Sequence, residues 1–228
     1  MKVEEIDFFP LSHTILGYHD CHACGIVDRD LERAAVGHPC GRCGAESHGA
    51  HSHFPFSVPT LIDLIQHNYH APEHKGAGSV IAGPESHRLT VIVLFSSLTE
   101  VLLQHFLVEG LLAQGVPVAS VASRLKETQF VEPRLKKLFP LVAKESWAKG
   151  LKALPLVGGM AAWDVATFCR IVAVARNRFL HQGNKWAIPD TMPLKCVQTL
   201  PPLLQMFVAL HNRYVARPLV GGSTGSAA

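Results

Sequence analysis

The stretch LTVIVLFSSLTEVLLQHFLVEGLL, residues 89–112, decides the fold of this chain. Its apolar residues recur at helical spacing and form one broad face, which includes Leu94, Leu98, Val101, Leu102 and Phe106. Glu100, His105 and Glu109 interrupt the run, whereas a membrane span needs about 20 mostly apolar residues without charge at its centre. The stretch therefore predicts a buried core helix over residues 86–114.

Further helical patterns lie on both sides of this core helix. They cover residues 58–69, 120–130, 132–147, 160–182 and 202–217, with breaks expected at Pro133, Pro140, Gly158-Gly159, Gly183 and Pro201. The Gly- and Pro-bearing segment 71–86 predicts a loop, and no hairpin pair follows residue 57. The sequence therefore predicts a mainly α fold, a bundle of four to five helices.

Composition sets broad limits on the class of protein. With 228 residues, 48% of them hydrophobic, the chain suits one domain of about 150 residues with a small appendage. A net charge of +3 and a pI near 8.6 are compatible with a polyanionic partner but not with a non-specific nucleic-acid coat. The first residues, MKVEEIDFFPLSH, lack the basic start and apolar run of a secretory signal. We expect a cytoplasmic protein without membrane association.

Four of the six cysteines form two Cys-x-x-Cys turns, CHAC and CGRC, separated by fifteen residues. This spacing is typical of zinc sites, in which each turn offers two thiolates to a tetrahedral ion. A glycine follows each turn, Gly25 and Gly44, and can take the positive φ that such a knuckle demands. The predicted ligands of a structural Zn²⁺ ion are Cys21, Cys24, Cys40 and Cys43.

The segment around these cysteines, over residues of about 15 to 46, resembles a zinc ribbon. Four cysteines close the coordination sphere, so the metal would fold the module and would not catalyse. The alternative, a pair of disulfides, is disfavoured in the cytosol. The knuckles leave open whether the ribbon binds nucleic acid, binds a protein or only supports the fold. We interpret His48, His51 and His53, which follow, as part of a polar linker and not as a second metal site, because no cysteine or acidic residue accompanies them.

These patterns divide the chain into three parts. We predict a zinc-ribbon module with its linker over 1–56, a helical bundle over 57–217, and a disordered tail over 218–228 that contains GGSTGSAA. The two remaining cysteines, Cys169 and Cys196, are expected to be small buried apolar residues of the bundle.

The candidate catalytic residues lie at the end of the predicted helix 160–182, in the segment VARNRFLHQGN. Asn177 and His181 are four residues apart and share a helix face, with Arg170 near the same stripe. Arg176 lies about 140° from His181 on an ideal helix, so it would reach round to that cleft or across to a neighbouring chain. Gly183 is placed to end the helix in a left-handed conformation.

This set of side chains suits the cleavage of RNA without metal. That reaction needs proton transfer to or from the sugar oxygens, which histidine performs, and a cation beside the developing charge on phosphorus, which arginine supplies. Asn177 would orient the imidazole or donate to a phosphate oxygen. Glu100 is expected to pair with Arg170 or Arg176 and to fix the guanidinium. The structural alternative is that Arg176 and Asn177 solvate a helix end and that His181 is a polar terminal residue.

On the residues RNRFLH, the chain resembles the HEPN superfamily, whose signature is Arg, a polar residue, three variable residues and His near a helix end. SSLTEVLLQHFL is similar to the family's earlier helix, which often bears a glutamate, and the resemblance covers about residues 60 to 215. It implies a metal-independent endoribonuclease active as a homodimer, in which two such motifs meet in one composite cleft. Carried over by position, Arg176 would hold the scissile phosphate, Asn177 would assist, and His181 would be the general acid or base.

The resemblance also implies a biological setting. Many relatives act in antiviral defence, toxin-antitoxin pairs or RNA processing, so an inhibitory or antitoxin protein is an expected partner. One departure concerns regulation, because Gly183 stands where the toxin branch silenced by adenylylation has a tyrosine. We expect a single-stranded RNA substrate, since in-line attack needs a flexible backbone. The competing hypotheses are a non-catalytic module that binds a nucleotide or a protein, and, less favoured, a zinc-ribbon regulator that binds DNA.

Overall fold

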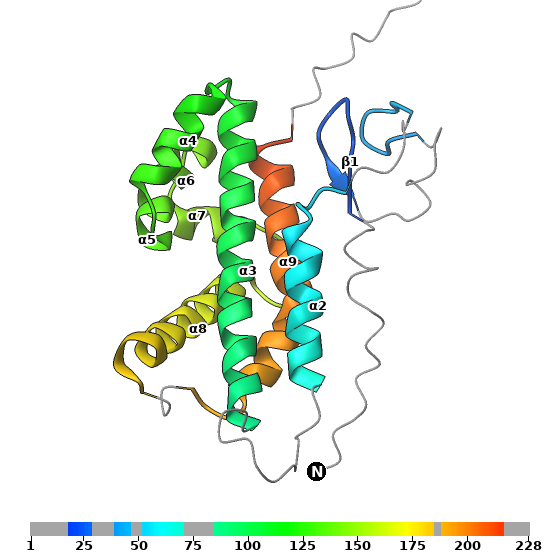
Figure 1. Ribbon diagram of the computed structural model, residues 1–228. Helices are drawn as coiled ribbons and strands as arrows, with labels where there is room; N and C mark the ends of the chain where they lie inside the picture. The colour runs from blue at the N-terminus through cyan, green and yellow to red at the C-terminus, as the bar shows by residue number, and fades with distance from the viewer. Residues whose placement is uncertain (1–17, 29–38, 47–51, 71–83, 185–187, 217–228) are drawn as a thin grey trace, which may run out of the picture.

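The computed structural model describes residues 18–28, 39–46, 52–70, 84–184 and 188–216, and these form a mainly helical protein with a small cysteine-bearing module at its N-terminal side (Figure 1). The longer helices are α2 (Ser57–His70), α3 (Pro84–Ala113), α4 (Val118–Glu127), α8 (Ala162–Gln182) and α9 (Met192–Tyr214). The predicted fold class is therefore confirmed. The predicted tail 218–228, residues His48 and His51, and most of the predicted loop 71–86 lie outside the described residues.

Helix α3 is the central element, as its sequence predicts. It runs beside α2 and α9 and crosses α8, and its buried side chains include Ile92, Phe95, Leu98, Leu102, Phe106 and Leu107 (Figure 1). By length and composition alone, His87–Ala113 could cross a membrane, but half of its most apolar window is buried inside the protein. The core position accounts for the apolar composition, because this helix meets neighbours on several faces.

Helix α9 differs from the prediction, which began the last helix at residue 202 after a break at Pro201. The helix runs without a break from Met192 through Pro201 and Pro202 to Tyr214. A proline inside a helix removes one hydrogen bond to the carbonyl four residues earlier. Packing compensates for that loss here, because Pro202 is buried and lies against the turn at Gly158. The expected break at Pro201 was therefore wrong.

The segment 132–147 was predicted as helical with breaks at Pro133 and Pro140, and in the structure it is divided elsewhere. It comprises α5 (Val131–Pro133), the π-helix η2 (Arg134–Leu138) and α6 (Phe139–Ala143), followed by α7 (Trp147–Lys152). The wide turn, in which the N–H of Phe139 donates to the carbonyl of Arg134, brings the chain to Pro140 without breaking it. Lys144 then takes a left-handed conformation, φ 59°, which ends α6. The division thus falls at Lys144 and not at Pro140.

The small module packs against the C-terminal end of α9 (Figure 1). Strands β1 (His19–Asp20) and β2 (Val27–Asp28) form an antiparallel pair around the first cysteine turn. The Asn212 side chain accepts from the N–H of Val27 at 2.7 Å and donates to its carbonyl at 2.8 Å, as a neighbouring strand would. The ring Nε2 of His211 lies 3.0 Å from the carbonyl oxygen of Gly25. These contacts attach the module to the bundle.

Candidate functional site

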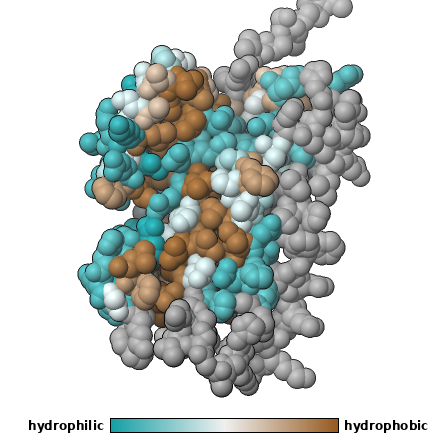
Figure 2. All heavy atoms as spheres, in the orientation of Figure 1, coloured by the Kyte–Doolittle hydropathy of each residue, from teal (hydrophilic) through white to brown (hydrophobic). Residues whose placement is uncertain are grey.

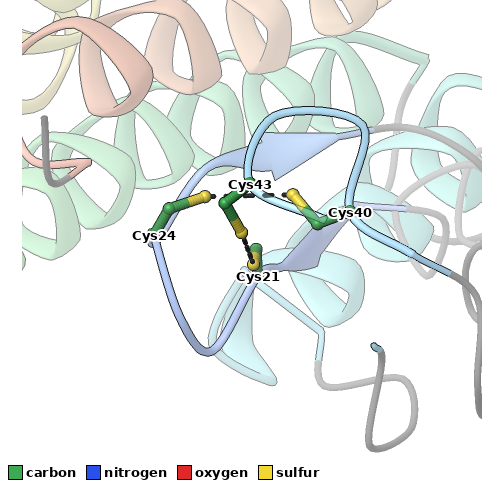
Figure 3. Close-up of side chains that lie close together, drawn as sticks. All are labelled: Cys21, Cys24, Cys40 and Cys43. Atoms are coloured by element: carbon green, nitrogen blue, oxygen red, sulfur yellow. Dashed lines mark hydrogen bonds between the residues drawn. The ribbon is translucent and has the colours of Figure 1, made fainter. Parts of the chain in front are cut away.

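The four cysteines of the module converge on one point (Figure 3). Their sulfur atoms all lie within 4.8 Å of one another, with Cys21 Sγ 3.6 Å from Cys43 Sγ and Cys24 Sγ 3.9 Å from Cys40 Sγ. Metal–sulfur bonds of about 2.3 Å in a tetrahedron place two sulfurs about 3.8 Å apart. The spacing of the cluster therefore fits one tetrahedral metal ion.

Both cysteine turns have the same backbone geometry. The N–H of Gly25 donates to the carbonyl of Cys21 at 2.7 Å, and the N–H of Gly44 donates to the carbonyl of Cys40 at 2.8 Å. The two glycines have φ of 67° and 73°, in the left-handed region that side chains with a Cβ rarely adopt. The prediction that both glycines take a positive φ is confirmed.

No disulfide joins the four cysteines of the cluster. A disulfide needs sulfurs about 2.05 Å apart, so the two close pairs are not bonded and the disulfide alternative does not apply to the structure. Burial raises the pKa of Cys24 to about 12. Burial also acts against ionisation of Cys21, but hydrogen bonds from the backbone N–H groups of Cys24 and Ala23 and from the side chains of Cys40 and Cys43 together outweigh it and lower the pKa of Cys21 to about 7. A divalent cation would stabilise the four thiolates together.

Of the predicted residues in the helical part, the structure brings Arg176 and Glu100 together. Arg176 Nη2 donates to Glu100 Oε1 at 2.8 Å, with side chains 20% and 38% exposed. Of the two arginines considered as partners of Glu100, it is Arg176 that makes the ion pair, while Arg170 is exposed on α8. The Nε of Arg176 is buried without a hydrogen-bond partner among the described residues. The guanidinium is thus held at the contact of α8 with α3.

Asn177 and His181 lie on the outer face of α8. Both side chains are exposed, and the described residues give neither of them a hydrogen bond or ion pair. The helix ends at Gly183, whose φ is 62°, as predicted. Arg176 is directed at Glu100, so one chain does not bring its Arg176 and His181 together on a shared surface.

Helix α8 also exposes several apolar side chains. Trp163 is 43%, Ile171 is 48% and Val174 is 45% exposed. One side of the helix carries five exposed residues, because steps of seven, four, three and four each come close to whole helical turns. They are Trp163, Arg170, Val174, Asn177 and His181. Figure 2 shows hydrophobic surface over α8 and the adjoining part of α3. Exposed apolar surface of this kind is typical of an interaction face.

The two remaining cysteines lie in helices α8 and α9. Cys169 and Cys196 are buried, as expected, and burial raises the pKa of Cys169 to about 12.

His53 is 5% exposed, so its interpretation as part of a polar linker was wrong. Its apolar neighbour Phe54 is buried beside it, a signal that the sequence offered. The attachment residues His211 and Asn212 gave no such signal, because their partners lie more than 180 residues away in the chain.

Comparison with protein-family models, with curated proteins and with solved structures yields no match to this chain. The evidence for the mainly helical fold and for the four-cysteine cluster is therefore the structure alone. The resemblance to HEPN proteins stays a prediction from the sequence motif.

Proposed function

We propose that this chain is a metal-independent endoribonuclease of the HEPN type that cleaves single-stranded RNA as a homodimer. The observation that carries the proposal is the exposed face of α8, where Asn177 and His181 lie unpaired among apolar side chains. A second copy that covers this face would bury Ile171 and Val174 and bring two such faces together.

The proposed reaction uses only groups of the protein and the substrate. The 2′-hydroxyl loses its proton and attacks phosphorus, the bond to the 5′-oxygen breaks, and that oxygen takes a proton. The products are a 2′,3′-cyclic phosphate and a 5′-hydroxyl. His181 serves as the general base or the general acid of these proton transfers, and Asn177 orients the imidazole or donates to phosphate.

Arg176 supplies the positive charge for the phosphate. Since Glu100 fixes its guanidinium at the edge of α8, Arg176 acts across the dimer together with His181 of the other copy. The composite site thus needs both chains.

The cysteine cluster would hold a structural Zn²⁺ ion, because four thiolates in this spacing leave no position for water or substrate. The resemblance further suggests a cytoplasmic effector in defence or in a toxin-antitoxin pair, held inactive by an inhibitory protein.

One observation favours a second candidate, a non-catalytic module that binds a nucleotide or a protein partner. Glu100 already neutralises Arg176, whose side chain is only 20% exposed. A guanidinium in that state is less able to stabilise the negative charge that develops on phosphorus, so the exposed face of α8 would then bind a nucleotide or a protein without cleavage, and Arg176 would be structural.

Cleavage of labelled single-stranded RNA in EDTA tests the proposal. The wild-type protein is compared with His181→Ala and with His67→Ala, which removes an exposed histidine of α2 as a matched control. We expect cyclic-phosphate products from the wild type and the control and a loss of at least about 100-fold in the His181 variant. Zinc content is measured after the assay, since chelation of the structural ion would unfold the module. Equal cleavage by all three proteins, or none with any RNA, rejects the ribonuclease in favour of the binding module.

A further inference from the structure

A second cluster of metal-ligating side chains lies where the cysteine module meets the bundle. Asp20 belongs to β1, His53 precedes α2, and His211 lies in the last turn of α9. One ligand atom from each lies within 4.8 Å of the other two. Three segments far apart in the sequence therefore converge on one point, at the opposite end of the bundle from the C-terminus of α8 (Figure 1).

The hydrogen bonding of His211 leaves one ring nitrogen free to bind an ion. Its Nε2 lies 3.0 Å from the carbonyl oxygen of Gly25, which only accepts, so this nitrogen must carry the proton. In the neutral ring Nδ1 then holds a lone pair, and Nδ1 is buried with no partner among the described residues. Histidines that bind metals have this pattern, in which the second nitrogen donates to a carbonyl.

His53 and Asp20 complete a set of nitrogen and oxygen ligands. His53 Nδ1 lies 2.8 Å from Asp20 Oδ1, and the rings of His53 and His211 are 4.6 Å apart. Tetrahedral bonds of about 2.0–2.1 Å place nitrogen and oxygen ligands about 3.3 Å apart. To bind one ion, His53 Nδ1 and Asp20 Oδ1 would move apart by about 0.5 Å. The most distant pair of ligand atoms would approach by at most about 1.5 Å, and side-chain rotation can provide both movements.

The surroundings suit an ion as well. His53 and His211 are 5% and 6% exposed, whereas the Asp20 side chain is 40% exposed and gives a route from solvent. Burial, aided by the neighbouring His53, lowers the pKa of His211 to about 4, so its ring is neutral at neutral pH. His105 packs against His53 with ring centres 5.0 Å apart and lies outside the group of three.

We propose that Asp20, His53 and His211 bind a second divalent transition-metal ion, separate from the four-cysteine site. Two imidazoles and one carboxylate are ligands that Zn²⁺ and related ions accept, with a further position for water. The ion would join the module, the segment before α2 and the end of α9, and so fix the module on the bundle. It takes no part in the RNA chemistry proposed for α8.

Metal stoichiometry of the full chain tests this site. The protein is stripped of metal, reloaded with Zn²⁺ and analysed by mass spectrometry for zinc per chain, and Co²⁺ titration reports the ligand type. His211→Gln keeps an amide donor for the Gly25 carbonyl but removes the Nδ1 lone pair, and His53→Asn keeps a donor for Asp20. His105→Gln is the matched control, because it changes a neighbouring histidine outside the ligand set.

We expect the wild type and the control to bind two zinc ions, and each ligand variant to lose one while keeping the thiolate-to-cobalt charge-transfer band. A wild type that binds one ion, or ligand variants that still bind two, overturns the proposal. Should the variants fail to fold, the Co²⁺ titration of the wild type decides. A second equivalent that adds weak visible absorption without further thiolate charge transfer supports the site, and no uptake of a second equivalent rejects it.

Discussion

Arg176 Nη2 donates to Glu100 Oε1 over 2.8 Å, and this ion pair joins α8 to the central helix α3. Each side chain is partly exposed, so solvent screens the pair, yet the contact fixes one end of the guanidinium. The arginine of the RNRFLH motif is therefore positioned by an acid 76 residues earlier in the chain. In the proposed enzyme, Glu100 is a positioning residue.

Glu100→Gln tests that role, because it keeps the shape of the side chain and removes its charge. We expect a loss of about 1 kcal/mol in the free energy of unfolding, the upper range for a partly exposed ion pair. Urea unfolding followed by circular dichroism measures it. RNA cleavage should fall by less than in His181→Ala, because Arg176 stays present but less well oriented. Loss of cleavage as complete as in His181→Ala would instead make Glu100 a catalytic group.

Val174→Glu tests the α8 face. Val174 is 45% exposed and lies on the same side as Asn177 and His181, so the change should leave the helix intact. A charge at the centre of an apolar interface would separate the proposed dimer and abolish cleavage with it. Val118→Glu, on the exposed side of α4 at 73% exposure, is the matched control. Light scattering after size-exclusion chromatography gives the oligomeric state. A monomeric wild type that still cleaves RNA contradicts the composite site.

The sequence predicts well the features that depend on local rules. The helical period of 89–112 locates the core helix, and the Cys-x-x-Cys turns with Gly25 and Gly44 give the knuckle geometry. Gly183 marks the end of α8 for the same reason, since a left-handed residue there satisfies the last carbonyls of a helix.

Features set by distant packing are not predictable in this way. Pro201 and Pro202 remain inside α9 because Pro202 packs against Gly158, which lies over 40 residues earlier in the chain. His53 belongs to a buried cluster only because His211 and Asp20 come to the same place. A histidine in a Gly- and Ser-rich segment gives the same local pattern whether it is solvated or buried.

The contact of Asn212 with β2 makes a third prediction. Val27 is 3% exposed, and both of its backbone groups bond to the Asn212 side chain. Asn212→Ala leaves a buried N–H and a buried carbonyl without partners, which should lower the free energy of unfolding by about 2 kcal/mol. Asn212→Asp should cost at least as much, since it keeps the acceptor but places a negative charge beside the carbonyl.

Hydrogen exchange at the Val27 amide and chemical unfolding check both variants. Asn177→Ala, at an exposed asparagine of α8, serves as the control and should leave unfolding unchanged. Unaltered protection of the Val27 amide in Asn212→Ala would mean that the module does not depend on this contact.

Gly110→Ala makes the fourth prediction, because helix propensity and packing give opposite signs. In the interior of a helix alanine is favoured over glycine by about 1 kcal/mol. A Cβ at Gly110, however, would overlap Cγ1 of Val142 and lie 2.9 Å from its Cγ2, at the contact of α3 with α6. Both residues are buried, so neither the new methyl group nor the Val142 side chain can turn toward solvent to relieve the overlap. We expect a net destabilisation of about 1–3 kcal/mol.

A double-mutant cycle with Val142→Ala isolates that overlap. Val142→Ala alone should destabilise by leaving a cavity, and the added methyl of Gly110→Ala should fill part of it. The double variant should then be more stable than the sum of the single changes predicts, by at least about 1 kcal/mol in urea unfolding. Additive effects, or a Gly110→Ala variant more stable than the wild type, would mean that α3 and α6 separate easily and that helix propensity alone governs this position.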